Sequence, residues 1–291
     1  MSRLLIVNPY ASGVTEELLA RVLAALPAGT EAVPTGGPGD ATALAREHEA
    51  SVDAIYVLSG DGTYNEVLNG VSGPVPLGFL PAGGTSVLPR ALGLGRDPVT
   101  AAHRLARGHV RPIGLGRVNG RRFGFNAGVG FDAEIVRRID ALGRPLDGTR
   151  PSDVAFAKAV LGLLASRRAS FPPVLELDGG RRAAFLLVAN CSPYTYAGSL
   201  GIRLTPGASF DLGLDAVAPG SVRAWGLPRL AFDLVRGARP RRGLTVLHDS
   251  ARFEVRCDLP LPLQVDGEDL GDVDHAVFEA EPRAVTALVG A

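Results

Sequence analysis

Lysine is almost absent from this sequence, and its scarcity excludes two large classes of phosphate-binding protein. Of the 30 basic residues only Lys158 is a lysine, and it lies in an apolar stretch with helical periodicity. A Walker-type phosphate loop needs Gly-Lys-Ser/Thr, and a protein kinase needs a lysine on a strand near its glycine-rich loop. A nucleotide bound by this chain must therefore be held by backbone amides, hydroxyl groups and arginine.

Cysteine and long apolar segments are equally scarce. Only Cys191 and Cys257 are present, far apart, which favours a reducing compartment and argues against a zinc site. The apolar run at residues 4–7 is too short for a signal peptide. The longest charge-free run, residues 67–89, contains four prolines and five glycines. We therefore expect a cytoplasmic protein with no transmembrane segment.

The sequence also lacks an excess of either charge. Its 30 basic residues balance its 30 acidic residues, so no overall field attracts a nucleic acid or an anionic bilayer. We expect no nucleic-acid partner, and any contact with a membrane must be local. A homodimer is compatible with the sequence.

The apolar runs divide the chain into two differently built parts. Up to about residue 111, strand-like runs alternate with helical patterns, which predicts a parallel sheet with helices on both faces. From residue 112 to about 279 strand-like runs predominate, with a hairpin at Asn119-Gly120 and one helix over roughly residues 152–166. We expect a doubly wound α/β nucleotide-binding domain at residues 1–111 and a β-rich domain at 112–279.

A glycine-rich loop with a carboxylate follows the apolar strand at residues 54–58. It reads Ser59-Gly60-Asp61-Gly62-Thr63 and leads into a helical pattern that contains Asn65 and Glu66. Unpaired amides at such a helix start, together with the helix dipole, can face a phosphate. Asp61 is repelled by phosphate unless a cation lies between them, so it indicates Mg²⁺ bound with the nucleotide. An ordinary turn capped by Asp61 or Thr63 explains the same five residues equally well.

Two further segments have the composition of phosphate loops. The first of them follows the strand at residues 4–7, which a proline ends. Its side chains and one backbone amide can face a phosphate or a ribose. The residues of this segment are Asn8, Pro9, Ser12 and Gly13. The other segment contains Gly83, Gly84 and Thr85. Each is compatible with a structural turn, but loops off adjacent strand ends predict one shared nucleotide crevice.

Taken in order, these segments resemble the catalytic domain of the diacylglycerol kinase family. The run Ser59 to Gly70 is similar to the family's Gly-Gly-Asp-Gly-Thr helix-entry loop, whose first position is often serine in sphingosine kinases. The other nucleotide loops of the family resemble Asn8 to Gly13, Thr35, and Leu80 to Thr85. The resemblance extends from Asn8 to Glu268 and so covers nearly the whole chain.

The resemblance implies a lipid kinase that uses ATP and Mg²⁺. In this family a C-terminal β-sandwich holds the lipid, the active site lies between the domains, and the final residues, here about 280–291, rejoin the first domain. A late Asp-Gly-Glu element supplies the proposed general base for the lipid hydroxyl, and Glu268 matches it, although Asp-Gly alone indicates only a hairpin. With Asp61 as the other catalytic residue, diacylglycerol would become phosphatidic acid in phospholipid biosynthesis. The protein would bind peripherally to the inner membrane face.

The sequence departs from the family pattern in two places. Some bacterial members hold a structural Mg²⁺ with an aspartate and a tyrosine, but Leu212 and Leu214 stand at those positions here. Asp211 and Asp215 remain as nearby carboxylates. Ser86 replaces the usual asparagine after Gly-Thr, and it is shorter, with fewer hydrogen-bond donors. We expect the structural Mg²⁺ site to be missing and the amide cradle to remain.

Two other functions are compatible with the sequence. NAD kinases also use a Gly-Gly-Asp-Gly-Thr loop, although the opening Asn-Pro-x-x-Ser-Gly and the late Asp-Gly-Glu fit lipid kinases better. The departures at Leu212, Leu214 and Ser86 are also compatible with a catalytically silent lipid-binding or regulatory protein.

Overall fold

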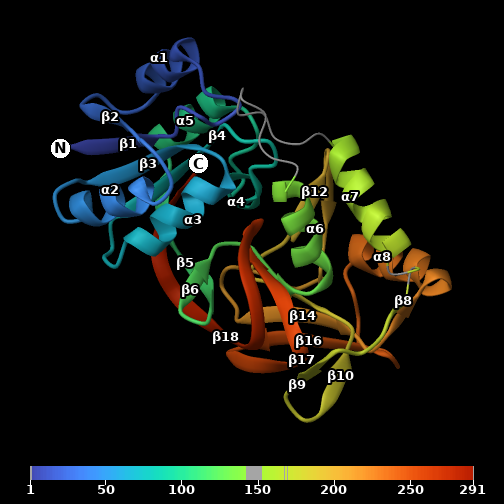
Figure 1. Ribbon diagram of the computed structural model, residues 1–291. Coiled ribbons are helices and arrows are strands. Elements are labelled where there is room, and N and C mark those ends of the chain that lie inside the picture. The colour runs from blue at the N-terminus through green and yellow to red at the C-terminus, as the bar shows by residue number, and fades with distance from the viewer. Residues whose placement is uncertain (1, 142–152, 167, 169, 291) are drawn as a thin grey trace. The chain divides into compact units, whose positions relative to one another are not determined.

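The structure, a computed structural model, describes residues 2–141, 153–166, 168 and 170–290. Its described residues separate into two units (Figure 1). Unit 1 comprises residues up to 114 together with those from 283 onward, and unit 2 comprises residues 115–141 and 153–282. Two long strands, β5 (His109–Val118) and β18 (Glu268–Val289), contribute residues to both units.

Unit 1 is built on a parallel sheet. Its strands are β1 (Arg3–Val7), β2 (Thr30–Pro34), β3 (Ala54–Ser59) and β4 (Pro76–Pro81), in the order β4-β3-β1-β2. The last part of β18 pairs in parallel with β4. All six residues of β3 are buried, as expected of a central strand in a sheet that helices cover on both faces.

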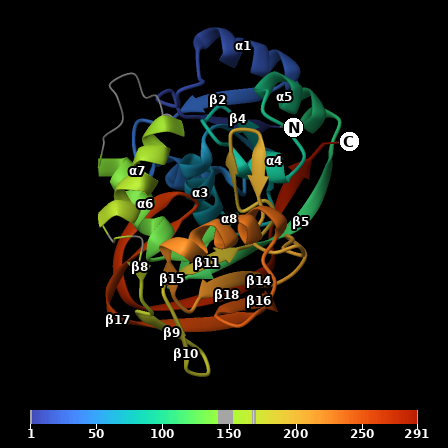
Figure 2. The same cartoon turned by 90° about the vertical axis from the view of Figure 1, so that its right-hand side faces the viewer.

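Five helices of unit 1 surround this sheet. They are α1 (Glu16–Ala25), α2 (Asp40–His48), α3 (Asp61–Gly70), α4 (Val87–Ala91) and α5 (Pro98–Ala106). Helix α1 packs with α5 on one side of the sheet, and α2 packs with α3 on the other (Figures 1 and 2). The Thr15 side chain begins α1 by accepting a hydrogen bond from the Leu18 amide at 3.1 Å. The expected doubly wound α/β arrangement is confirmed.

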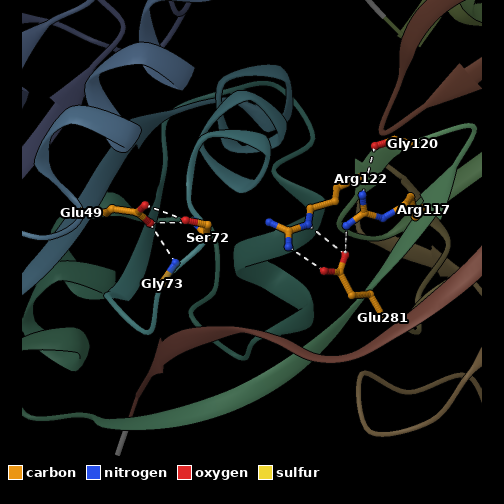
Figure 3. A network of polar contacts seen from close by, with 7 residues as sticks. All are labelled: Glu49, Ser72, Gly73, Arg117, Gly120, Arg122 and Glu281. Carbon is orange, nitrogen blue, oxygen red and sulfur yellow. Dashed lines mark hydrogen bonds and ion pairs between the residues drawn. The ribbon is translucent and has the colours of Figure 1, made fainter.

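Glu49, directly after α2, holds the loop that connects α3 to β4. Its carboxylate accepts hydrogen bonds from the Ser72 amide at 2.7 Å, the Ser72 hydroxyl at 2.8 Å and the Gly73 amide at 2.9 Å (Figure 3). The hydrogen bonds from the backbone amides of Gly73 and Ser72 lower the pKa of Glu49, because they stabilise the charged carboxylate.

Unit 2 is rich in strands. Besides β5 and β18 its strands are β6 (Arg121–Phe123), β7 (Asn126–Val129), β8 (Ser170–Phe171), β9 (Leu175–Leu177), β10 (Arg181–Ala183), β11 (Leu186–Ala189), β12 (Thr195–Ala197), β13 (Leu200–Ile202), β14 (Leu214–Pro219), β15 (Val222–Arg223), β16 (Leu244–Ser250) and β17 (Arg252–Val265). Its helices are α6 (Phe131–Ala141), α7 (Asp153–Ser166) and α8 (Leu227–Arg236), with a 3-10 turn η1 (Ala224–Gly226). The main sheet runs antiparallel in the order β16-β14-β11-β7-β17-β18.

Side chains of these strands alternate between two apolar cores. On β11, Val188 belongs to one core and its neighbour Leu187 to the other, as the two-residue period of a strand requires. The first core is enclosed by strands and contains the stacked rings of Phe253 and Phe278, 5.1 Å apart. The second core receives side chains from α6, α7 and α8, including Leu230. The expected strand-rich second part is therefore confirmed.

A cluster of two arginines and one glutamate ties β5, β6 and β18 together within unit 2. Arg122 binds Glu281 through two nitrogens, at 2.9 and 2.5 Å, and Arg117 binds the same carboxylate at 2.9 Å (Figure 3). Paired guanidinium contacts of this kind fix strand register as well as adding charge stabilisation.

Gly70 allows α3 to approach α2, and this contact gives a first prediction. A Cβ at Gly70 would lie 2.5 Å from the Thr42 carbonyl oxygen. We predict that Gly70→Ala lowers the free energy of unfolding by about 1–3 kcal/mol, because the helices must move apart. Denaturant unfolding measures this. The matched variant Gly37→Ala, where a Cβ meets nothing within 4 Å, should keep or slightly raise stability, and equal losses would contradict the packing argument.

Candidate functional site

The candidate site of unit 1 lies at the carboxyl ends of its parallel strands. Asn8 follows β1, Thr35 follows β2, the loop from Ser59 follows β3, and Gly83 to Thr85 follow β4. The chain leaves β1 toward α1 and β3 toward α3, which lie on opposite sides of the sheet (Figure 1). The strand order reverses between these neighbouring strands, and this is where open α/β sheets bind ligands.

Buried hydroxyl groups join the loops after β1 and β3. The Ser59 hydroxyl donates to Thr63 Oγ1 at 2.7 Å, and Asn8 Nδ2 donates to the same oxygen at 3.2 Å. The hydroxyl of Tyr64 lies 2.7 Å from the carbonyl oxygens of both Ser59 and Leu80, so it bridges β3 and β4. Burial raises the pKa of Tyr64 well above its ordinary value, so this hydroxyl stays a hydrogen-bond donor. The sequence reasoning assigned no role to Tyr64.

Glycines let the backbones of the three loops touch. A Cβ at Gly83 would lie 2.5 Å from the Cα of Gly60, and a Cβ at Gly13 would lie 2.7 Å from the Ala82 carbonyl oxygen. The Gly13 amide donates to that oxygen at 3.0 Å. These glycines are needed for space, because any side chain would separate the loops.

The first turn of α3 has the features of an anion site. Its amides, at Asp61, Gly62 and Thr63, have no acceptor inside the helix and lie at the positive end of the helix dipole. The Asp61 carboxylate lies 3.4 Å from the Leu88 amide and remains half-buried. In the part of the chain that the structure describes, no group of three or more His, Cys, Asp or Glu side chains is placed to hold a metal by itself. One carboxylate beside an amide cradle fits Mg²⁺ that is shared with nucleotide phosphates.

The remaining predicted residues divide into exposed and buried ones. Pro9, Ser12 and Gly84 are exposed on their loops. Asn65 is fully buried in α3, where its oxygens accept hydrogen bonds from Asn69. The Glu66 carboxylate accepts a hydrogen bond from the Ala41 amide at 3.2 Å, at the start of α2. Asn65 and Glu66 thus make helix contacts within unit 1.

Glu268 of unit 2 follows a tight hairpin turn between β17 and β18. Asp266 and Gly267 have φ values of 49° and 83°, the left-handed pair that a type I′ turn requires. The buried Asp266 carboxylate accepts hydrogen bonds from the amides of Gly124, Phe125 and Asn126 at 2.6–3.1 Å. Glu268 is one-third exposed, with its carboxylate 3.5 Å from a guanidinium nitrogen of Arg121.

A polar network supports this turn from inside unit 2. Gln264 accepts a hydrogen bond from the Gly267 amide at 3.0 Å and donates to the Asp132 carboxylate at 2.8 Å. The Tyr194 hydroxyl donates to the same carboxylate. Desolvation raises the pKa of Asp132, although the bonds from Tyr194 and Gln264 oppose this shift. The sequence reasoning assigned none of these three residues a role, because they are separated by up to 132 positions and join only in the fold.

Asp215, which the sequence left as an alternative ligand for a structural cation, is fully buried on β14. Its carboxylate accepts hydrogen bonds from the Thr205 hydroxyl and the Asp249 amide, and His248 Nδ1 lies 2.8 Å away. The chain's own donors therefore engage this carboxylate.

Comparisons with known proteins agree with this geometry. Several solved structures of kinases share this fold, with an α/β unit and a strand-rich unit. A diacylglycerol kinase structure from Bacillus anthracis superposes with a TM-score of 0.72 at 20% identity, covering 99% of this chain and 97% of that one. An NAD kinase from Archaeoglobus fulgidus, in complex with ATP, superposes with a TM-score of 0.53 at 15% identity, covering 99% and 94%.

Sequence comparison gives the family. Residues 2–118 match the model of the diacylglycerol kinase catalytic domain. The diacylglycerol kinase of Bacillus subtilis is 30% identical over 243 residues, which are 79% of this chain and 76% of that protein. The enzyme of Staphylococcus saprophyticus is 37% identical over 98 residues, which are 32% of each chain. The chain belongs to the diacylglycerol kinase family, as its motifs predicted.

The contact between Gly60 and Gly83 gives a prediction for the phosphate loops. We predict that Gly83→Ala weakens ATP binding at least about tenfold, because the new methyl group pushes apart two loops whose amides must converge. Isothermal calorimetry with Mg²⁺ measures this. Gly73→Ala, in a turn where the nearest atom to the new Cβ is 3.5 Å away, serves as the matched control. Equal affinity of the two variants would show that the loop contact is not needed.

The pair formed by His248 and Asp215 predicts a pH dependence. The hydrogen bond and the charge of Asp215 raise the pKa of His248 above 6.5, so the folded state binds this proton more tightly. The stabilisation is complete below about pH 6.5 and is lost as the pH rises through the raised pKa. Because the His248 side chain is 55% exposed, we expect a loss of less than about 1 kcal/mol.

Denaturant unfolding followed by circular dichroism over this pH range measures this loss. His248→Gln should remove the pH slope between about pH 6 and 8, whereas His103→Gln should keep it. A slope unchanged by His248→Gln would assign the titration to another group.

Proposed function

We propose that the protein is a lipid kinase that transfers the γ-phosphoryl group of ATP to a lipid hydroxyl, with diacylglycerol as the acceptor and phosphatidic acid as the product. The observation that carries this proposal is the close backbone contact of the loops after β1, β3 and β4, beside the start of α3. Membership of the diacylglycerol kinase family and the names of the relatives support the lipid acceptor.

The residues of unit 1 have distinct parts in the proposed reaction. The first amides of α3 and the glycine loops would hold the phosphates, which replaces the lysine of other nucleotide kinases. Asp61 would hold Mg²⁺ against the phosphate oxygens, and Mg²⁺ supplies the charge neutralisation that phosphoryl transfer needs. Ser59, Thr63 and Asn8 would keep the loops in place through their mutual hydrogen bonds.

Glu268 would act as the general base in this proposal. A carboxylate within hydrogen-bond reach of the acceptor hydroxyl can take its proton as the phosphoryl group arrives. The Asp266 carboxylate accepts hydrogen bonds from three backbone amides, and Gln264 accepts one from the Gly267 amide. These bonds fix the type I′ turn and so restrict the movement of the backbone at Glu268. Restricting a base in this way is a large part of what an enzyme contributes to phosphoryl transfer.

The lipid acceptor places the proposed reaction at a membrane surface. The helices in the described ranges are all too short or too polar to cross a bilayer. We propose that the protein works as a peripheral enzyme on the cytoplasmic face of the membrane.

An NAD kinase is the second candidate, because the fold of one is shared with this chain. Labelled ATP offered with NAD in one reaction and with diacylglycerol micelles or a total lipid extract in another separates the two functions. We expect a labelled lipid of phosphatidic acid mass and no labelled NADP. Turnover of NAD alone would refute the lipid kinase, and absence of ATP binding with Mg²⁺ would favour a silent lipid-binding protein.

Two carboxylate substitutions test the proposed roles. Glu268→Gln should lower kcat by roughly 10²–10⁴-fold with unchanged ATP affinity, because only proton transfer is lost. Asp61→Asn should weaken ATP binding in the presence of Mg²⁺ and have little effect in its absence. The exposed carboxylates Glu279 and Asp53, changed to Gln and Asn, are the matched controls. Unchanged kcat in Glu268→Gln would show that another group, or none, acts as the base.

A further inference from the structure

An apolar stripe on the outer side of unit 2 is exposed without serving the core. It starts at Trp225 in η1, which is 82% exposed, and continues along α8 with Phe232 at 58% and Val235 at 41%. Together with the exposed Pro228 these side chains recur every three or four residues, the spacing that places them on one helical face. Helix α8 is the orange helix on the outer side of unit 2 in Figure 1 and Figure 2.

The opposite face of α8 attaches it to unit 2. Leu230 is buried, and Leu234 packs against the same apolar core under the helices. The carbonyl oxygen of Leu234 accepts a hydrogen bond from the Arg203 amide at 2.9 Å, and the Ala238 amide donates to the Leu204 carbonyl at 2.7 Å. The helix is therefore held by one face, and the exposed aromatic stripe is surplus to folding.

Positive charge surrounds this stripe. Residues 221–243 contain six arginines and one acidic residue, Asp233, which gives this segment a formal charge of +5 in a chain whose net charge is zero. Arg241 is paired with Asp233 at 2.6 Å, and the Arg236 guanidinium lies 5.2 Å from the Phe232 ring centre. Within the described residues the structure gives no ion pair to the other five arginines, which are all exposed: Arg223, Arg229, Arg236, Arg239 and Arg242.

We infer that this surface, Trp225 to Arg242, docks the protein onto the head groups and outer acyl region of an anionic phospholipid bilayer. The inference rests on the proposed function for its purpose, since a lipid acceptor must be reached in a membrane. An amphipathic helix with aromatic residues on its outer face and flanking arginines lies in the bilayer interface, with its apolar side chains about 5–10 Å deep. Tryptophan favours this zone because its ring is apolar and its N–H remains hydrated.

Charge argues against the main alternative occupant, a second copy of the chain. A two-fold interface would bring two segments of formal charge +5 face to face, and such juxtaposition of like charges is unfavourable. Anionic phospholipids offer the complementary charge, and each arginine near their surface adds roughly fivefold to the binding constant.

The single tryptophan makes the test specific to this surface. The full chain is titrated with vesicles of phosphatidylcholine alone and with vesicles that contain phosphatidylglycerol, and both Trp225 emission and co-sedimentation are recorded. We expect a blue shift of the emission and sedimentation with the anionic vesicles, both reduced by salt. Sedimentation without a blue shift, or equal shifts with both vesicle types, would overturn the inference. So would a blue shift that appears on raising protein concentration without vesicles.

A variant that keeps the reporter tests the contribution of neighbouring residues. The double change Phe232→Ser with Arg236→Gln should lower partition into anionic vesicles at least about tenfold. The matched control is the double change Leu259→Ser with Arg256→Gln on β17. Leu259 is an apolar residue that is 73% exposed, and Arg256 is an exposed arginine. An equal loss in the control would overturn the assignment of the surface.

Kinase activity on a short-chain, water-soluble diacylglycerol separates this inference from the proposed function. We expect both double variants to keep wild-type rates on the soluble substrate, while the Phe232→Ser, Arg236→Gln variant loses activity on anionic vesicles. If the wild-type protein phosphorylates no lipid but Trp225 still enters anionic vesicles, the proposed function fails and the docking surface stands. If lipid is phosphorylated in vesicles equally by both variants, the docking surface fails and the function stands.

Discussion

The contact between the backbones of Gly60 and Gly83 is the constraint on which the candidate site depends. The loops after β3 and β4 meet there without any side chain between them, and the Gly13 amide joins the same junction from β1. The parallel neighbours β3 and β4 end at the same edge of the sheet, which brings their two loops within reach of each other. The start of α3 lies beside this contact, and a helix start can hold a phosphate without lysine.

Local patterns predicted most elements correctly because their causes are local. The helix over 152–166 and the hairpin at Asn119-Gly120 were read from periodicity and turn chemistry, and the structure has α7 at Asp153–Ser166 and φ values of 46° and 88° at the turn. Helix α8 was not predicted. Its sequence does carry a helical pattern, because Arg229, Asp233 and Arg236 recur at helical spacing on one side, away from its apolar residues. The apolar remainder of the helix is wide enough to include both the buried Leu230 and the exposed Phe232.

The loops of the candidate site could be predicted from the sequence, but the contacts of their individual side chains could not. Motif order placed Asn8, Ser59 and Gly83 at strand ends, and strand topology brings them together. Asn65 and Glu66 lie in the same motif, but their side chains bond to neighbouring helix groups. Those partners, such as the Ala41 amide 25 positions away, are determined by packing and leave no mark on the local sequence.

The carboxylates of the candidate site and its surroundings differ in how many hydrogen bonds they accept from the chain. This difference bears on whether each has a structural or a chemical role. Asp266 rests on three backbone amides, and Asp215 is buried among a hydroxyl, an amide and an imidazole. Carboxylates held in this way are fixed in position, which suits a structural role. Asp61 and Glu268 are instead half-buried, one at a helix start and one after a rigid turn. A carboxylate that must meet a cation or take a proton needs rigid support and solvent access together, and these two residues have both.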